Sequence, residues 1–191
     1  YKNNPEQFKF FEQGGEIATM GDDGQPMAQY EKSKSFLFIE KSRFDIEENW
    51  RKEVVGFRPP QEIYNEGLLD VVSQNGLQYF FGDRKHLRRA PLFLLDRSLV
   101  FFSRVSDDDL SLKKNHLLDT PEKVKNHLLE KMDEIMEMGG IFLFNINKSI
   151  ALEPFYIEAL TIFLSEVQTR KVPSLTLAEV SRWWNQREAV R

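Results

Sequence analysis

The order of apolar and polar positions along the chain predicts helices that alternate with short apolar strands. Apolar residues at helical spacing, framed by capping residues, prolines and glycines, indicate helices. Short apolar runs that end in polar or proline-rich segments indicate strands. The predicted helices cover residues 4–13, 29–50, 65–76, 121–138, 154–170 and a last segment after Thr176. The predicted strands cover residues 16–19, 54–58, 77–81, 92–95, 99–102 and 141–146. This alternation favours an α/β fold.

Two of the helices have apolar faces that we expect to be buried, because their spacing follows the helical repeat. The faces comprise Phe36, Ile39, Phe44 and Ile46 in the first, and Val124, Leu128, Ile135 and Met136 in the second. Helix ends are also marked: Asn65 and Thr120 are N-caps, and Thr176 with Glu179 forms a capping box. The helix after Thr176 carries Trp183 and Trp184.

The segments that follow the strands are the places where an α/β protein binds ligands, because parallel strands end at one shared rim. In this chain they are residues 19–24, 58–62, 82–84 and 145–148. The runs 92–95 and 99–102 are separated only by Asp96-Arg97-Ser98, which predicts a hairpin. Asp107, Asp108 and Asp109 then predict a polar loop.

Composition adds limits to this picture. With 191 residues, of which 41% are hydrophobic and 29% charged, the chain is expected to form one globular domain over residues 1–191. The net charge of −4 argues against a nucleic-acid partner, and we interpret the basic residues Arg84, Lys85, Arg88 and Arg89 as a solvated loop. Cysteine is absent, which removes disulfides and thiolate chemistry. No apolar run approaches the ~20 residues that a membrane span needs.

Residues 56–83, GFRPPQEIYNEGLLDVVSQNGLQYFFGD, resemble the polysaccharide deacetylase family, the NodB-homology carbohydrate esterases. The segments LVFFSRVSDDD, MGGIFLFNINKSIALEPFYIEALTIFLSEV and LAEVSRWW follow in the order of the C-terminal half of that family. The resemblance extends over about residues 5–186. It implies a distorted (β/α) barrel that lacks its N-terminal strands here, with the missing part expected upstream of Tyr1.

The same resemblance implies a chemistry. Family members remove acetyl groups from N-acetylated sugars with a divalent metal, usually zinc, which polarises the amide and acidifies a bound water. An aspartate and two histidines hold the metal, a second aspartate is the base, and a late histidine is the acid. A periplasmic or cell-envelope location is also what the resemblance implies.

The stretch GGEIATMGDDG, residues 14–24, aligns with the family motif that carries the two metal histidines. Their positions fall on Met20 and Gly24, and the late histidine falls on Asn147. Methionine is a weak ligand for zinc, glycine has no side chain, and an asparagine amide does not shuttle protons. Arg58 and Asp83 stand at matching positions; in the family the arginine steadies the base and the acid tunes the late histidine. Three chemical groups of the family are therefore replaced in an otherwise similar frame.

Each remaining candidate has a simpler alternative. Asp22 and Asp23 are weak candidates for a hard cation such as Ca²⁺ or Mg²⁺, or they form a polar turn. Arg58 faces a ligand, or it forms a structural ion pair with a carboxylate such as Asp83. Tyr64 contacts a sugar, or it packs in the core. The three histidines, His86, His116 and His127, share no ligand spacing and predict no zinc site.

The sequence thus predicts a degenerate carbohydrate-deacetylase-like domain that acts as a scaffold or glycan-binding module, with no cofactor of its own. The alternative is an active hydrolase of N-acetylated sugars that holds its metal through Asp22, Asp23 and upstream acids. A third hypothesis is a purely structural domain. Carbohydrate is the expected ligand, and upstream residues or a second copy of the chain are expected to cover exposed strand edges.

Overall fold

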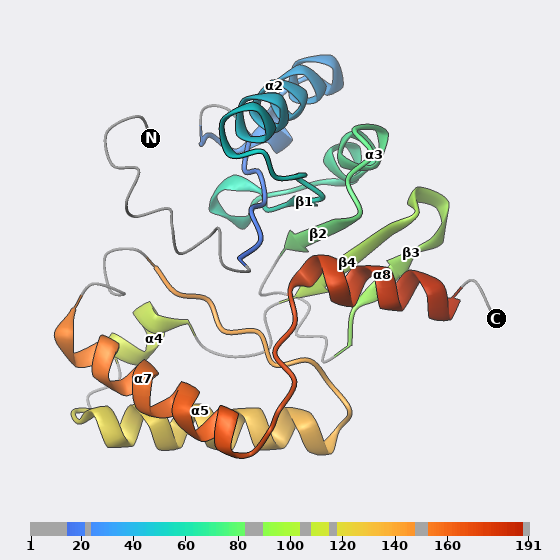
Figure 1. Ribbon diagram of the computed structural model, residues 1–191. Coiled ribbons are helices and arrows are strands. Elements are labelled where there is room, and N and C mark those ends of the chain that lie inside the picture. Colours follow the sequence, from blue (N-terminus) through green and yellow to red (C-terminus); the bar gives the residue numbers. More distant parts are fainter. Residues whose placement is uncertain are drawn as a thin grey trace. The chain divides into compact units, whose positions relative to one another are not determined.

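The computed structural model describes residues 15–21, 24–82, 90–103, 108–114, 118–147 and 153–188. They fall into two compact units (Figure 1). The first contains residues up to 83 together with 91–102 and 175–191, and the second contains 84–90 and 103–174. The predicted helix over residues 4–13 lies outside the described residues. The mixed helix and strand content confirms the α/β prediction.

The first unit is built on a four-stranded sheet with the order β1-β2-β4-β3. The strands are β1 (Gly56–Phe57), β2 (Tyr79–Gly82), β3 (Leu92–Leu94) and β4 (Leu99–Ser103). β1 and β2 are parallel, with Gly56 opposite Tyr79, and β3 and β4 form the predicted antiparallel hairpin, with Phe93 opposite Val100. The predicted strand over residues 16–19 contributes one parallel bridge, from Thr19 to Phe57. Barrel closure stays a prediction.

Three helices accompany this sheet: α2 (Lys32–Trp50), α3 (Glu66–Gln74) and α8 (Leu177–Glu188). Short 3-10 turns lie at η2 (Met27–Gln29), η3 (Pro60–Glu62) and η4 (Leu95–Arg97). α2 packs against α3, and α8 packs against β2 and β3. The predicted caps are confirmed: Asn65 Oδ1 accepts a hydrogen bond from the Leu68 amide at 2.9 Å, and Thr176 and Glu179 satisfy each other's backbone amides.

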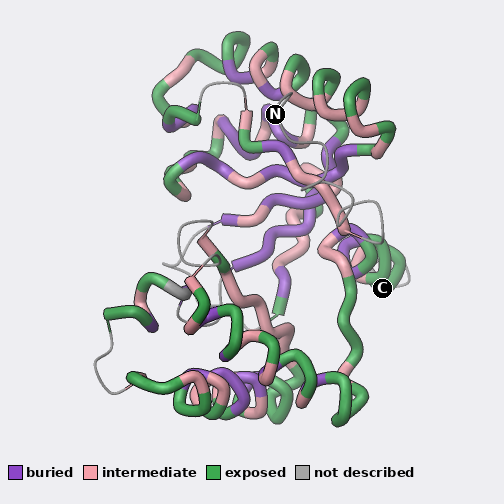
Figure 2. The backbone as a smooth tube through the Cα atoms, turned by 60° about the vertical axis from the view of Figure 1, so that its left-hand side comes forward, coloured by how far each residue is buried: buried purple, intermediate pink, exposed green. Residues whose placement is uncertain are grey.

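The core of the first unit lies between the sheet and the helix pair α2 and α3. Because side chains alternate along a strand, Phe57, Phe80 and Phe101 share this buried face while Tyr79 and Phe102 point to the other. The Phe80 and Phe101 rings stack 5.4 Å apart. Figure 2 shows buried positions along the strands and exposed ones along the outer sides of the helices. The predicted burial of Phe44 is wrong: it lies five positions after Ile39, off the face that Ile39 and Ile46 present to the core, and is exposed.

Gly56 is required by a close approach inside the sheet. A Cβ atom at this position would overlap the ring of Tyr79, its partner in the parallel register. The glycine at the start of the GFRPP segment therefore serves packing, since no larger residue fits beside the tyrosine ring.

The second unit is helical in its described part. It contains α4 (Asp109–Lys114), α5 (Pro121–Glu137) and α7 (Pro154–Thr169), and α5 packs along α7. Thr120 caps α5 as predicted. The predicted burial of Met136 is wrong, because the buried face of α5 runs through Leu128, Met132 and Ile135 and leaves Met136 exposed.

Two further predictions in this unit are corrected. Asp109 begins α4 instead of a polar loop, and Asp108 caps that helix by accepting from the Ser111 amide at 2.9 Å. Residues 141–146 form no strand in the described structure. Their alternating aromatic residues, Phe142 and Phe144, instead pack against the buried cluster of α5 and α7, so an apolar run has found burial without a sheet partner.

Candidate functional site

The strand-end rim of the first unit is built by Thr19–Gly21 beside Arg58. The Thr19 amide donates to the Gly56 carbonyl at 3.0 Å, and the Arg58 amide donates to the Thr19 carbonyl at 2.9 Å. This parallel ladder sets Met20 next to Arg58. Thr19 is fully buried, and its hydroxyl hydrogen-bonds Ser42 Oγ at 2.7 Å and accepts from the Gly21 amide at 3.1 Å. The backbone of the motif is therefore firmly held.

The chain turns sharply directly after Met20. Gly21 has φ +88°, and a Cβ there would lie 2.6 Å from the sulfur of the buried Met27. Gly24 has φ +67°, with no heavy atom within 4 Å of a Cβ built on it. Asp22 and Asp23, between these glycines, lie outside the described residues.

The described residues of this rim do not fit a zinc ion. Met20, which is 44% exposed, offers only a thioether, and no heavy atom of the described residues lies within 4 Å of a Cβ built on Gly24. Zinc in proteins prefers imidazole, thiolate and carboxylate ligands. Among the described residues, no group of three histidine, aspartate or glutamate side chains is arranged to hold a metal. His127 is half-buried on α5.

Arg58 forms a structural ion pair at the rim, but with a partner that the sequence did not indicate. Its Nη2 lies 3.0 Å from Glu62 Oε1, and the two side chains are 31% and 17% exposed. Its guanidinium also lies 5.4 Å from the centre of the Phe81 ring. Glu62 reaches Arg58 because Gln61 and Glu62 both adopt left-handed backbone conformations, with φ 56° and 59°. Asp83, the predicted ion-pair partner of Arg58, lies outside the described residues.

Two other sequence candidates are placed elsewhere. Tyr64 packs into the core, with its ring centre 5.2 Å from Phe80 and 5.6 Å from Phe101. The side chain is half-buried, and a sugar contact at Tyr64 stays a prediction. Asn147 is half-buried in the second unit.

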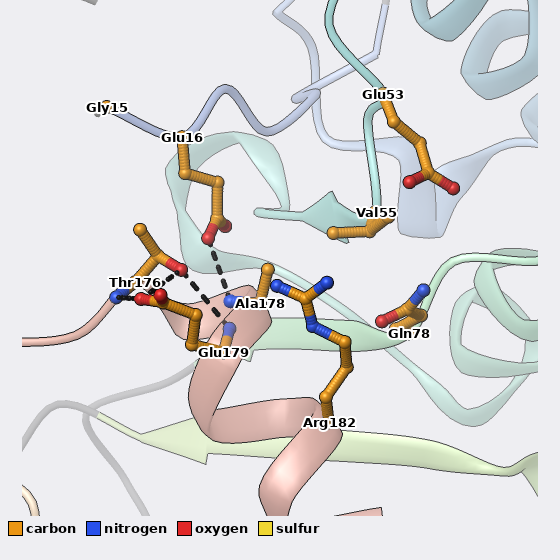
Figure 3. Close-up of a pocket in the computed structure, with 9 residues that line it drawn as sticks. All are labelled: Gly15, Glu16, Glu53, Val55, Gln78, Thr176, Ala178, Glu179 and Arg182. Atoms are coloured by element: carbon orange, nitrogen blue, oxygen red, sulfur yellow. Dashed lines mark hydrogen bonds between the residues drawn. The ribbon is translucent and has the colours of Figure 1, made fainter. Parts of the chain in front are cut away.

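A hollow at the opposite ends of the same strands was not predicted. It has a volume of about 290 Å³ and is lined by Gly15, Glu16, Glu53, Val55, Gln78, Thr176, Ala178, Glu179 and Arg182 (Figure 3). Glu16 and Val55 precede the rim segments, and Gln78 precedes β2. The start of α8 supplies the remaining wall. The hollow therefore lies at the amino ends of the strands, whereas the rim lies at their carboxyl ends.

Glu16 is the best-connected polar side chain of this hollow. Its Oε2 accepts from the Ala178 amide at 2.8 Å, and its Oε1 accepts from the hydroxyl of Tyr79. Burial raises the pKa of Glu16, and the hydrogen bonds from Ala178 and Thr176 partly oppose that rise. A glutamate inside a predicted apolar strand was the available signal for this contact.

The carboxylate of Glu179 also accepts hydrogen bonds within the protein. It accepts from the Thr176 amide at 2.7 Å, and that hydrogen bond is the main reason why the pKa of Glu179 is lowered. In the described part of the chain, Arg182 and Glu53 make no hydrogen bond or ion pair, and the buried Oε1 of Gln78 has no hydrogen-bond partner. Figure 3 shows Arg182 extending from α8 into the hollow.

None of the helices that the structure describes is long and apolar enough to cross a membrane. This agrees with the sequence, which contains no apolar run of that length.

Comparison of the sequence alone with known proteins gives no match, either to a family model or to a curated protein. Comparison of the structure does. A protein of Pseudomonas aeruginosa PAO1 described as a polysaccharide deacetylase superposes with a TM-score of 0.79 at 15% identity, over 97% of this chain and 64% of that one. One from Mycobacterium smegmatis, similarly described, gives 0.70 at 21% identity, over 85% and 60%. Puue allantoinase gives 0.77 at 12% identity, over 97% and 64%.

The chain thus spans less than two thirds of the length of these structures. At such low identity the likeness concerns the fold. The resemblance that the motif residues predicted is confirmed at that level: this chain has the fold of the polysaccharide deacetylase structures, over part of their length.

Proposed function

We propose that this chain is a catalytically degenerate, deacetylase-like domain that binds glycans without hydrolysing them. One observation carries the proposal: hydrogen bonds hold the backbone at Thr19, while the resemblance puts the family's two metal-ligand positions at Met20 and Gly24. Thr19 and Gly21 preserve the turn through hydrogen bonding and packing. A domain that has this local fold but lacks the metal-ligating side chains is better suited to glycan binding than to metal-dependent hydrolysis.

The ion pair between Arg58 and Glu62 supports the same proposal. A guanidinium that steadies a catalytic base must keep its donors available to that base. Here one of them is directed to Glu62, four residues along the same segment. Glu62 offsets the charge of this guanidinium, which then suits contact with hydroxyl groups better than activation of water.

The experiment combines metal analysis with a turnover assay on the purified chain. We expect substoichiometric zinc after exposure to equimolar zinc, and no acetate release from N-acetylglucosamine oligomers. Stoichiometric zinc together with acetate release would overturn the proposal. The Asp22→Ala/Asp23→Ala double variant then decides the alternative: loss of turnover in that variant would establish an active hydrolase that uses these carboxylates.

Binding is measured separately from turnover. Titration with neutral N-acetylglucosamine oligomers should give saturable chemical-shift changes in the intact chain. Absence of any response to neutral, cationic and anionic saccharides would leave a purely structural domain.

A further inference from the structure

The outer face of α8 presents a large aromatic surface. Trp183 is 52% exposed, which is high for so apolar a side chain. Its ring lies 5.5 Å from that of Trp184 in an edge arrangement. The Arg187 guanidinium lies 5.5 Å from one ring centre and 5.4 Å from the other. These contacts hold the indoles in place, so a ligand meets a preformed surface and little side-chain entropy is lost on binding.

The residue before Trp183 connects this surface to the hollow. Arg182 lines the hollow, together with Glu53 and Gln78. Glu16 and Glu179, the other acids of the wall, already accept hydrogen bonds. Among the residues described, the exposed groups of the wall that make no hydrogen bond are therefore the Arg182 guanidinium and the Glu53 carboxylate, while the Oε1 of Gln78 is buried.

This set identifies a ligand by its chemistry. Sugar hydroxyls donate to the carboxylate and accept from the guanidinium. The hollow is lined by the carboxylates of Glu16, Glu53 and Glu179 against the single guanidinium of Arg182, so an oligosaccharide without anionic groups is favoured over an anionic one. The C–H face of a pyranose ring is apolar and flat, and it packs on an exposed indole. The volume of about 290 Å³ is near the lower end of small-molecule pockets, and suits one sugar unit.

We propose that this α8 surface, formed by Arg182, Trp183, Arg187 and the adjoining hollow, binds a neutral oligosaccharide. One sugar unit enters the hollow and its neighbour lies on Trp183. The inference rests on the glycan-binding part of the proposed function and moves it away from the strand-end rim. The ligand would then bind at the amino ends of the strands, whereas the residues of the family motif lie at their carboxyl ends.

The test is a titration of the full chain with N-acetylglucosamine trimer, followed by amide chemical shifts. The same titration is run with glucosamine trimer, which is cationic, and with galacturonate trimer, which is anionic. We expect the neutral trimer to bind more tightly than the anionic one and to shift amides of α8. Trp183→Ala and Arg182→Ala should each weaken binding about tenfold, a typical loss for a central contact. Trp183→Phe, which keeps an aromatic face, should restore part of the affinity.

Two variants serve as references. Leu95→Ala removes an even more exposed apolar side chain, in the hairpin turn, and should leave binding unchanged. Met20→Ala removes the exposed thioether of the rim. Thermal unfolding of each variant shows whether it is folded, and the Phe variant keeps the test decisive if Trp183→Ala is not.

The outcomes separate this inference from the proposed function. Binding that Met20→Ala weakens and Trp183→Ala does not would place the glycan at the rim, overturning the α8 surface but keeping a glycan-binding domain. Stronger binding of either charged trimer would overturn the neutral ligand. No binding of any trimer would overturn both.

Discussion

The two ends of the same strands in the first unit differ in what their polar residues do. At the amino ends, Glu16 accepts hydrogen bonds from two separate elements, β2 and α8. At the carboxyl ends, the polar pair Arg58 and Glu62 comes from one short segment. At the amino ends one carboxylate thus connects elements that are distant in the sequence, whereas the polar pair at the carboxyl ends is local. The proposed function adds that Met20 and Gly24, at the carboxyl ends, stand where the resemblance puts the metal ligands.

The largest loss of stability is expected from substitution of Gly56, the glycine that packs against the Tyr79 ring. Gly56→Val should destabilise the protein by about 3 kcal/mol, because the added atoms overlap the Tyr79 ring inside the sheet. Chemical denaturation followed by circular dichroism measures the loss. Gly24→Ala is the matched control: space is open there, so only the left-handed backbone opposes it, at about 1 kcal/mol. Equal losses at the two sites would contradict the distinction between packing and ligand positions.

The next largest effect concerns Glu16. Glu16→Ala leaves the Ala178 amide and the Tyr79 hydroxyl without their acceptor, and should cost about 1–3 kcal/mol in the free energy of unfolding. Glu16→Gln, which keeps one carbonyl oxygen, should cost less. Hydrogen exchange should increase in the first turn of α8 in the alanine variant. Unchanged exchange there would show that the contact does not hold the helix.

The pH dependence of this contact has a definite sign. Burial raises the pKa of Glu16 in the folded protein above its unfolded value, so the folded state binds the proton more tightly. The contribution of Glu16 to stability is therefore fully present below the unfolded pKa, and is lost as the pH rises through the folded pKa. The difference in unfolding free energy between the wild type and Glu16→Gln should change in that window in favour of the wild type at the acid end. A difference that is independent of pH would contradict the burial of this carboxyl.

The smallest effect is expected at the rim. Gln61→Gly should stabilise the protein by about 0.5–1 kcal/mol, because glycine adopts the left-handed conformation found at Gln61 without strain. Glu62→Gln should destabilise by less than about 1 kcal/mol, since the ion pair with Arg58 is partly solvated. Thermal denaturation resolves both. A loss from Gln61→Gly would show that the glutamine side chain, and not the backbone, stabilises the turn.

Local chemistry explains which parts of the fold the sequence could predict. The caps at Asn65, Thr120 and Thr176 and the hairpin turn depend on residues a few positions apart, and all were correctly predicted. Residues 141–146 were misread as a strand because their apolar alternation is local, whereas pairing requires a distant partner. Phe142 and Phe144 reached a helical cluster instead.

The features of the candidate site also differ in whether the sequence could predict them. The assignment of Met20 and Gly24 to the metal-ligand positions came from the residues of the motif alone and stays a prediction. The pairing of Arg58 with Glu62 was not, because it requires two consecutive left-handed residues that are not glycine. The hollow beside α8 combines residues from the two ends of the chain, and no local pattern brings them together. The sequence signal for this hollow was Glu16, a glutamate within a predicted apolar strand.

The contact between Glu16 and Ala178 joins residues that are 162 positions apart. During synthesis, Glu16 leaves the ribosome long before α8, so the early segment cannot complete its hydrogen bonding until α8 has emerged. A product truncated before α8 would bury a carboxylate without its amide donor or leave the early segment unpacked. Helix α8 thus completes this segment late in synthesis, and products truncated before it are expected to be early substrates for proteolysis.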